Sequence, residues 1–190
     1  MREILLRYWS IYGGWKAIFK SGYFWIAFVL SLAMYSQWAC TNGWWEDILS
    51  IMPNMLGFSL GGYAMWLAIG DDDFRALISG QDEDGSPSPY MQVNAAFVHF
   101  IMLQIISIIG ALLVQAFYKP IVEEFSMATK LCEIAVGSYL LAIWYWFTYL
   151  IFIYAIMSAM AATFSLLRVS SWYDIHQTEK MKKKNDRNEM

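Results

Sequence analysis

The sequence predicts an all-α, polytopic membrane protein: a bundle of four transmembrane helices with an N-terminal interfacial helix and both termini in the cytoplasm. Composition is the first observation, because the 190 residues are 58% hydrophobic and only 15% charged, against about 25% charged in a typical soluble domain. The second is a set of apolar segments, most of them long enough to cross a hydrocarbon core about 30 Å thick. The expected spans are residues 22–38, 48–70, 93–117 and 134–167.

The third observation is the distribution of cations. With the N-terminus inside, the four spans leave eleven of the 13 Lys and Arg residues on the cytoplasmic side, and only Lys119 and Lys130 outside. Cytoplasmic segments of membrane proteins carry such an excess of Lys and Arg. The same topology places Cys40 and Cys132 together on the outer side, where an oxidising periplasm would permit a disulfide.

Residues 1–21 precede the first span and are predicted to form an interfacial amphipathic helix. Lys16 and Lys20 can extend to lipid headgroups while apolar side chains face the membrane. These apolar side chains recur at helical spacing: Ile4, Leu5, Tyr8, Ile11, Tyr12 and Trp15.

The first and second spans form a predicted hairpin, because residues 39–47 between them are few and include no Lys or Arg. Aromatic side chains flank the first span, as interfacial belts do. Tyr23, Phe24 and Trp25 mark one interface, and Trp38, Trp44 and Trp45 mark the other.

The second span is unusually rich in small and polar residues for a lipid-facing helix. Pro53 and Asn54 precede a GxxxG pair, Gly57 and Gly61, which is followed by Gly62. A GxxxG pair lets two helix backbones approach closely. The segment therefore predicts a surface for helix packing or oligomerisation.

Residues 71–90 form the longest polar connection and are expected in the cytoplasm. Asp71 is predicted to cap a short helix whose first turn holds Asp72 and Asp73, where acids favour the helix dipole. The acidic surface is either simply solvated or a docking patch for a soluble partner. The predicted partner contacts are Asp71, Asp72, Asp73, Asp82, Glu83 and Asp84.

The third span carries a polar stripe, because Gln104, Ser107, Ala111 and Gln115 fall within about 80° of one another on a helix. Such a stripe either forms hydrogen bonds between helices or lines a pore or cavity. His99 points to the opposite side and is interpreted as a packed or interfacial histidine rather than a proton relay. Pro120 is expected in the first turn of a separate helix after this span.

The fourth span, residues 134–167, has no charge over 34 residues. As a helix it would be about 51 Å long, so part of it must tilt strongly or project from the bilayer. Its second half predicts another close-packing surface. This surface comprises Ala155, Ser158, Ala159 and Ala162.

Residues 168–190 are predicted to be a basic cytoplasmic tail. Its cations would attract the anionic headgroups of the cytoplasmic leaflet. The predicted headgroup contacts are Lys180, Lys182, Lys183 and Lys184.

No motif in the chain indicates catalysis, a cofactor or a metal, so a non-enzymatic protein is expected. The two histidines, His99 and His176, have no metal-ligand spacing with the cysteines. The spans also lack a charged residue near their centres, which weakens the case for an ion-coupled transporter.

The segment Pro-Asn-x-x-Gly-Phe-x-x-Gly-Gly-Tyr, residues 53–63, together with four spans in 190 residues, resembles the Kiwa membrane protein family of bacterial anti-phage defence. The resemblance implies a homo-oligomer in the inner membrane that senses phage and works with a cytoplasmic effector.

The sequence thus favours an oligomeric membrane sensor or anchor for a soluble cytoplasmic partner, without direct nucleic-acid binding. One alternative is a small pore that depolarises the membrane. Another is an immunity protein against a pore-forming toxin, since colicin immunity proteins resemble this chain in size and span number. The stripe from Gln104 to Gln115 discriminates the first two: a water-filled path favours the pore, and burial between helices favours the anchor.

Overall fold

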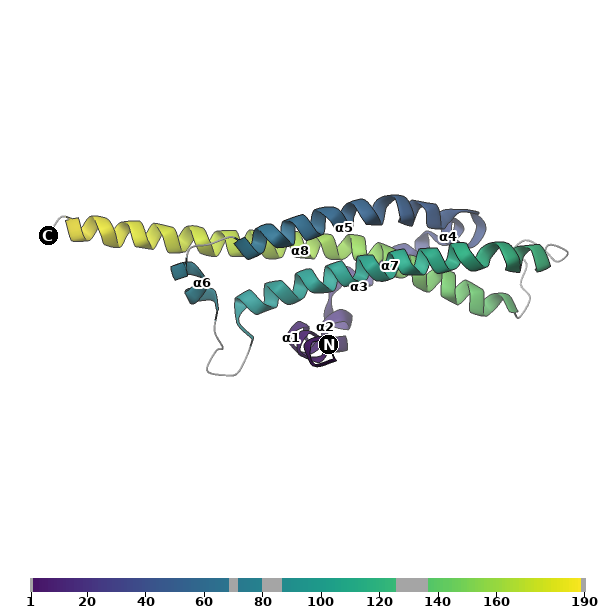
Figure 1. The fold of residues 1–190 in the computed structure, drawn as a ribbon, viewed down its shortest axis with the longest axis horizontal. Coiled ribbons are helices and arrows are strands. Elements are labelled where there is room, and N and C mark those ends of the chain that lie inside the picture. Colours follow the sequence, from purple (N-terminus) through teal and green to yellow (C-terminus); the bar gives the residue numbers. More distant parts are fainter. Residues whose placement is uncertain (1, 69–71, 80–86, 126–136, 189–190) are drawn as a thin grey trace.

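Helices make up almost all of the part of the chain that the structure describes (Figure 1). The structure is a computed structural model, and it describes residues 2–68, 72–79, 87–125 and 137–188. The helices are α1 (Arg2–Tyr12), α2 (Gly14–Lys20), α3 (Gly22–Ala33), α4 (Tyr35–Cys40), α5 (Trp44–Ala68), α6 (Asp72–Ile78), α7 (Pro89–Phe125) and α8 (Gly137–Asn188).

Two helices of the described chain are long and apolar enough to cross a membrane, α7 over Pro89–Phe117 and α8 over Leu140–Lys182. A third crossing is counted if Arg2–Lys20 and Gly22–Ala33, which meet at 46°, form one bent span. The 25-residue α5 does not join them, because Pro53, Asn54 and its glycines dilute its apolar side chains. The fold class is therefore confirmed as helical with candidate membrane spans, and the count of four spans stays a prediction.

α5, α7 and α8 run along the long axis of the molecule, and α7 contacts both of the others (Figure 1). α7 begins at Pro89, directly after Ser88, whose Oγ accepts a hydrogen bond from the Met91 N–H at 3.3 Å. It then continues through Pro120 to Phe125. The prediction of a separate helix starting near Pro120 is wrong. An internal proline removes one backbone hydrogen bond, and a long membrane helix can tolerate that loss.

α8 is continuous over 52 residues and is about 78 Å long at 1.5 Å per residue. The predicted boundary between a fourth span and a separate tail, at residues 167 and 168, lies inside this helix. Nothing in the sequence there breaks a helix, because Leu167 and Arg168 are both good helix formers. The basic tail is thus the end of α8, seen in yellow in Figure 1.

The N-terminal segment is two short helices, whereas one interfacial helix was predicted. Gly13 and Gly14 separate them with φ angles of +95° and +59°, in the left-handed region that glycine adopts without steric cost. A Cβ on Gly14 would also lie 3.1 Å from the Trp9 indole nitrogen. α1 is seen end-on in Figure 1, so it crosses the direction of the long helices, and it contacts α7.

The first predicted span, residues 22–38, is divided at Met34 into α3 and α4. The backbone carbonyl of Ser31 at this break accepts a hydrogen bond from the Trp38 indole at 2.7 Å. The Trp146 indole of α8 donates to the Ser31 hydroxyl at 3.1 Å. Indole donors from two helices therefore satisfy the buried Ser31, and they hold α3 and α4 against α8.

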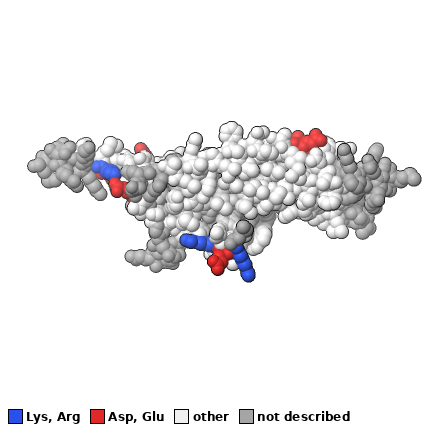
Figure 2. Space-filling view, viewed as in Figure 1, with Lys and Arg blue, Asp and Glu red and all other residues white. Residues whose placement is uncertain are grey.

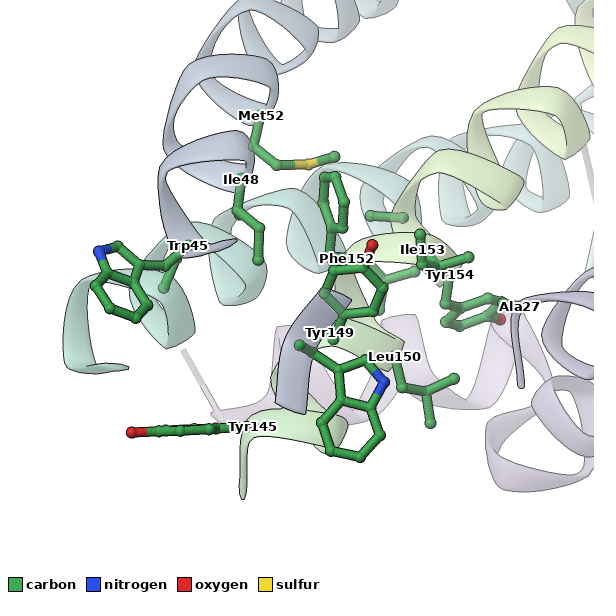
Figure 3. Close-up of a cluster of buried hydrophobic side chains, with 14 of the residues drawn as sticks. Ala27, Trp45, Ile48, Met52, Tyr145, Tyr149, Leu150, Phe152, Ile153 and Tyr154 are labelled. Carbon is green, nitrogen blue, oxygen red and sulfur yellow. The ribbon is translucent and has the colours of Figure 1, made fainter. Parts of the chain in front are cut away.

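In the main core, aromatic side chains of α8 pack against α5 and the N-terminal helices (Figure 3). Ile48 and Met52 of α5 are fully buried. Trp44 makes edge contacts with Tyr145 and Tyr149, both at 5.7 Å between ring centroids. In a bilayer, where lipid tails are as apolar as these side chains, such packing would stabilise the bundle through van der Waals contact rather than the hydrophobic effect.

Charged side chains gather toward the two ends of the molecule and on one flank, with a broad uncharged surface between them (Figure 2). Glu46 and Asp47 lie in the first turn of α5, while Asp73 lies on α6 at the other end. The uncharged surface is the part of the bundle suited to hydrocarbon.

Candidate functional site

The predicted acidic helix is present as α6, and it packs against the charged end of α8. Phe74 is 1% exposed and contacts the Tyr173 ring edge-on at 5.0 Å between centroids. α6, the end of α5, the start of α7 and α8 share a small apolar cluster. Its buried members are Trp66, Phe74, Ile78, Val93, Phe97 and Val169. We call α6 together with residues 168–188 of α8 the charged arm.

One ion pair joins the predicted partner-binding acids to the predicted lipid-binding cations. Lys180 Nζ lies 2.7 Å from Asp73 Oδ2, and both side chains are exposed. Asp73 and Lys180 therefore contact each other, although the sequence predicted separate binding roles for them. Exposed pairs of this kind contribute about 0–1 kcal/mol, so apolar packing of Phe74 is the stronger contact holding α6 in place.

Only some of the other charged residues predicted to bind a partner or lipid lie in the described part of the chain. Asp72 begins α6, as predicted, and Lys182 is exposed on α8. Lys183 and Lys184 belong to the last turns of α8. Asp71, Asp82, Glu83 and Asp84 lie outside the described residues.

The polar stripe of α7 is divided between the bundle interior and its surface. Gln104 is fully buried, and its Nε2 donates a hydrogen bond to Ser59 Oγ on α5 at 2.9 Å. Ser107 and Ala111 are also fully buried, whereas Gln115 is exposed. Within the described part of the chain, Gln104 links α7 to α5, whereas the buried Ser107 Oγ has no hydrogen-bond partner.

The glycines of α5 lie on an outward face of the chain. Gly57 and Gly61 are exposed, and a Cβ built on Gly57, Gly61 or Gly62 would meet no described atom within 4 Å. Asn54 is also exposed, and its Nδ2 donates to the Ser50 carbonyl of its own helix at 2.9 Å. Within one described chain, the three glycines leave the close-approach surface of α5 open.

The second small-residue surface, on α8, lies inside the bundle. Ala155, Ser158 and Ala162 are buried, and Ala159 is half-buried. Ser158 Oγ donates to the Ala155 carbonyl at 2.8 Å, so its hydroxyl is satisfied within the helix. These side chains allow close packing inside the single chain.

The closest approach to a described glycine was not predicted from the sequence. A Cβ on Gly110 of α7 would lie 2.9 Å from Thr148 Cγ2 of α8, closer than real Cβ contacts allow. A lone glycine inside an apolar helix can mark such a close approach. Gly110 gives only this weak signal, because it has no second glycine four residues away.

His99 is packed, as predicted, although its partners were not foreseen. Its Nδ1 lies 2.7 Å from the Tyr8 hydroxyl of α1, and its Nε2 lies 3.3 Å from the Tyr154 hydroxyl of α8. The Tyr12 ring stacks on the imidazole at 3.9 Å between centroids. This cluster fastens α1 to α7 and α8.

The described residues contain no group of three or more His, Cys, Asp or Glu side chains placed to hold a metal ion. Cys40 is exposed, and Cys132 lies outside the described residues, so the disulfide between them stays a prediction. Comparison with family models, curated proteins and solved structures found no match for this chain.

Proposed function

We propose that this protein is a non-enzymatic membrane anchor that presents the charged arm to a soluble partner. The continuity of α8 carries the proposal: one helix joins the apolar stretch from Leu140 to the charged end at Asn188. A partner bound at that end would be held at a fixed distance from the bilayer. α6 broadens the surface by adding acidic residues beside the basic ones.

We further propose four spans in a bacterial inner membrane, with the charged arm and both termini in the cytoplasm. Most Lys and Arg residues fall on that side, as the positive-inside rule requires. α3 with α4 would form the first crossing and α5 the second. Maleimide labelling of N185C should occur only after the cytoplasmic side is made accessible. Labelling of N185C in intact cells would contradict this topology.

The oligomer and the role in anti-phage defence are further parts of the proposal. The open glycine face of α5 has room for a helix from a second copy. The defence role is based on the resemblance of residues 53–63 to the Kiwa family. It predicts that deleting the gene removes protection against phage without changing growth of uninfected cells.

The direct test of partner binding uses the full chain in its native membrane. Replacing Asp82, Glu83 and Asp84 with Ser should weaken co-purification of the partner most at low salt, because high salt already screens exposed charges in the wild type. A second variant, Phe74→Ala, should release α6 from α8 and weaken the same co-purification. The matched control is Glu46→Gln with Asp47→Asn, which alters charge at the opposite end.

Three outcomes separate the hypotheses. Loss of the partner in the triple Ser variant and in Phe74→Ala, with retention in the control, supports the anchor. Equal retention in all variants contradicts it. Depolarisation of cells on expression of the wild-type chain, with no dependence on the arm, would favour the pore in its place.

A further inference from the structure

A cavity of about 770 Å³ lies between α1 and α2 on one side and α7 and α8 on the other. This volume falls in the range of small-molecule sites, about 300–1,000 Å³. Its walls are almost wholly apolar. They include Leu5, Leu6, Met102, Ile106, Phe147 and Ile151.

Three of the polar side chains that border the cavity are already bonded to one another. The hydroxyls of Tyr8 and Tyr154 lie within hydrogen-bond distance of the two nitrogens of His99. These groups already have hydrogen-bond partners, so they do not require a polar ligand to satisfy them. The chemistry of the walls therefore selects an apolar occupant.

The cavity is continuous with the lipid-facing surface. Two of its walls belong to the helices able to span a membrane, α7 and α8, and wall residues Ile106 and Phe147 are themselves exposed on that surface. In a bilayer such a space is in contact with hydrocarbon tails rather than water.

Arg2 also lines the cavity, and no ion pair to it is present among the described residues. Arg7, Lys16 and Lys20 add further positive charge to α1 and α2, against Glu3 alone. Basic side chains project from the surface in Figure 2 where Figure 1 places α1. A guanidinium can hold a phosphate through two parallel hydrogen bonds.

From these features we propose that the cavity binds one acyl chain of an anionic phospholipid, with the lipid phosphate at Arg2. The α1–α2 pair then acts as a clamp over a single lipid, and the His99 cluster holds that clamp closed. The site requires that α7 and α8 lie in a bilayer, but it does not depend on the soluble partner.

The test is native mass spectrometry of the full chain purified in detergent. The protein is incubated with equal amounts of phosphatidylglycerol and phosphatidylcholine of the same chain length. We expect preferential retention of one phosphatidylglycerol per chain. Arg2→Gln should weaken that retention about fivefold, the factor for one cation near an anionic surface. Lys16→Gln, on α2 but not in the cavity wall, is the matched control and should change retention less.

A second experiment fills the cavity with a larger side chain. Ile106→Trp and Met102→Trp should each exclude the bound lipid, while Met65→Trp, on the exposed surface of α5, should leave it bound. Circular dichroism and gel filtration verify that each variant is folded. Equal retention of the two lipids, equal loss in the Arg2 and Lys16 variants, or undiminished binding in both tryptophan variants would overturn the proposal. Retention of palmitate in preference to phosphatidylglycerol would overturn it as well.

Discussion

Two helices of the long bundle, α5 and α7, use small residues in opposite ways. On α5, Gly57 and Gly61 form the clearest close-packing pattern of the sequence, yet their positions lie open on the single chain. On α7, Gly110 belongs to no such pattern, yet among the described glycines it has the closest neighbour, Thr148 of α8. A small-residue motif therefore indicates that a close approach is possible, and only the fold determines whether the approach occurs within one chain.

The largest effect expected from this comparison comes from Gly110→Val. The added side chain would overlap Thr148, and overpacking of this kind costs about 1–3 kcal/mol in unfolding free energy. Thermal or denaturant unfolding in detergent measures the loss. The matched control is Gly57→Val, where the same side chain meets open space.

A double variant makes the test more specific. Thr148→Ser removes Cγ2, the atom nearest to the Gly110 position, so it should restore part of the lost stability. Coupling of about 0.5–3 kcal/mol is usual for residues in contact. If Gly110→Val and Gly57→Val destabilise equally, the distinction between the two faces does not hold.

An intermediate effect is expected at the inward face of α5, where Ser59 bonds Gln104. Gln104→Leu keeps the volume but removes the hydrogen bond, which in membrane proteins is worth about 0.6 kcal/mol. Ser59→Ala should cost a similar amount, and the double variant should cost little more than either alone. Gln115→Leu, on the exposed part of the stripe, should leave stability unchanged.

The smallest effect on the single chain is expected for Gly57→Leu. Its unfolding free energy should change by less than about 0.5 kcal/mol, as at other open surface sites. The size of the detergent-solubilised particle, measured by light scattering, should nevertheless fall if copies assemble through this face. Unchanged size for both Gly57→Leu and Gly61→Leu would remove the glycine face from the assembly.

The helical class could be predicted from composition and apolar segments, because a long apolar segment in a bilayer must satisfy its backbone hydrogen bonds within a helix. The short helix at Asp72 was also predictable, since capping and dipole rules act over a few residues. The breaks at Gly13 and Met34 were not. Gly13 adopts a left-handed conformation, and the contacts at the Met34 break come from Trp146 and Tyr149 of α8, each 115 residues from its partner.

The candidate site shows the same division. Burial of His99 was predicted from its place in the span, but its bonds to Tyr8 and Tyr154 depend on how α1 crosses the bundle. The ion pair between Asp73 and Lys180 joins residues 107 positions apart, and a charge pattern alone contains no information on such pairing. Local chemistry is readable from the chain, whereas partners distant in sequence require the fold.

In the proposed membrane topology, the unbroken course of α8 couples the tilt of its apolar stretch to the position of its charged end. Helices adjust their tilt when the bilayer changes thickness, and the segment beyond Leu167 is about 30 Å long at 1.5 Å per residue. A tilt change of about 10° would swing its end by about 5 Å. The pair of Asp73 and Lys180 bridges α8 to α6, so such a tilt change would alter the separation of these two charges.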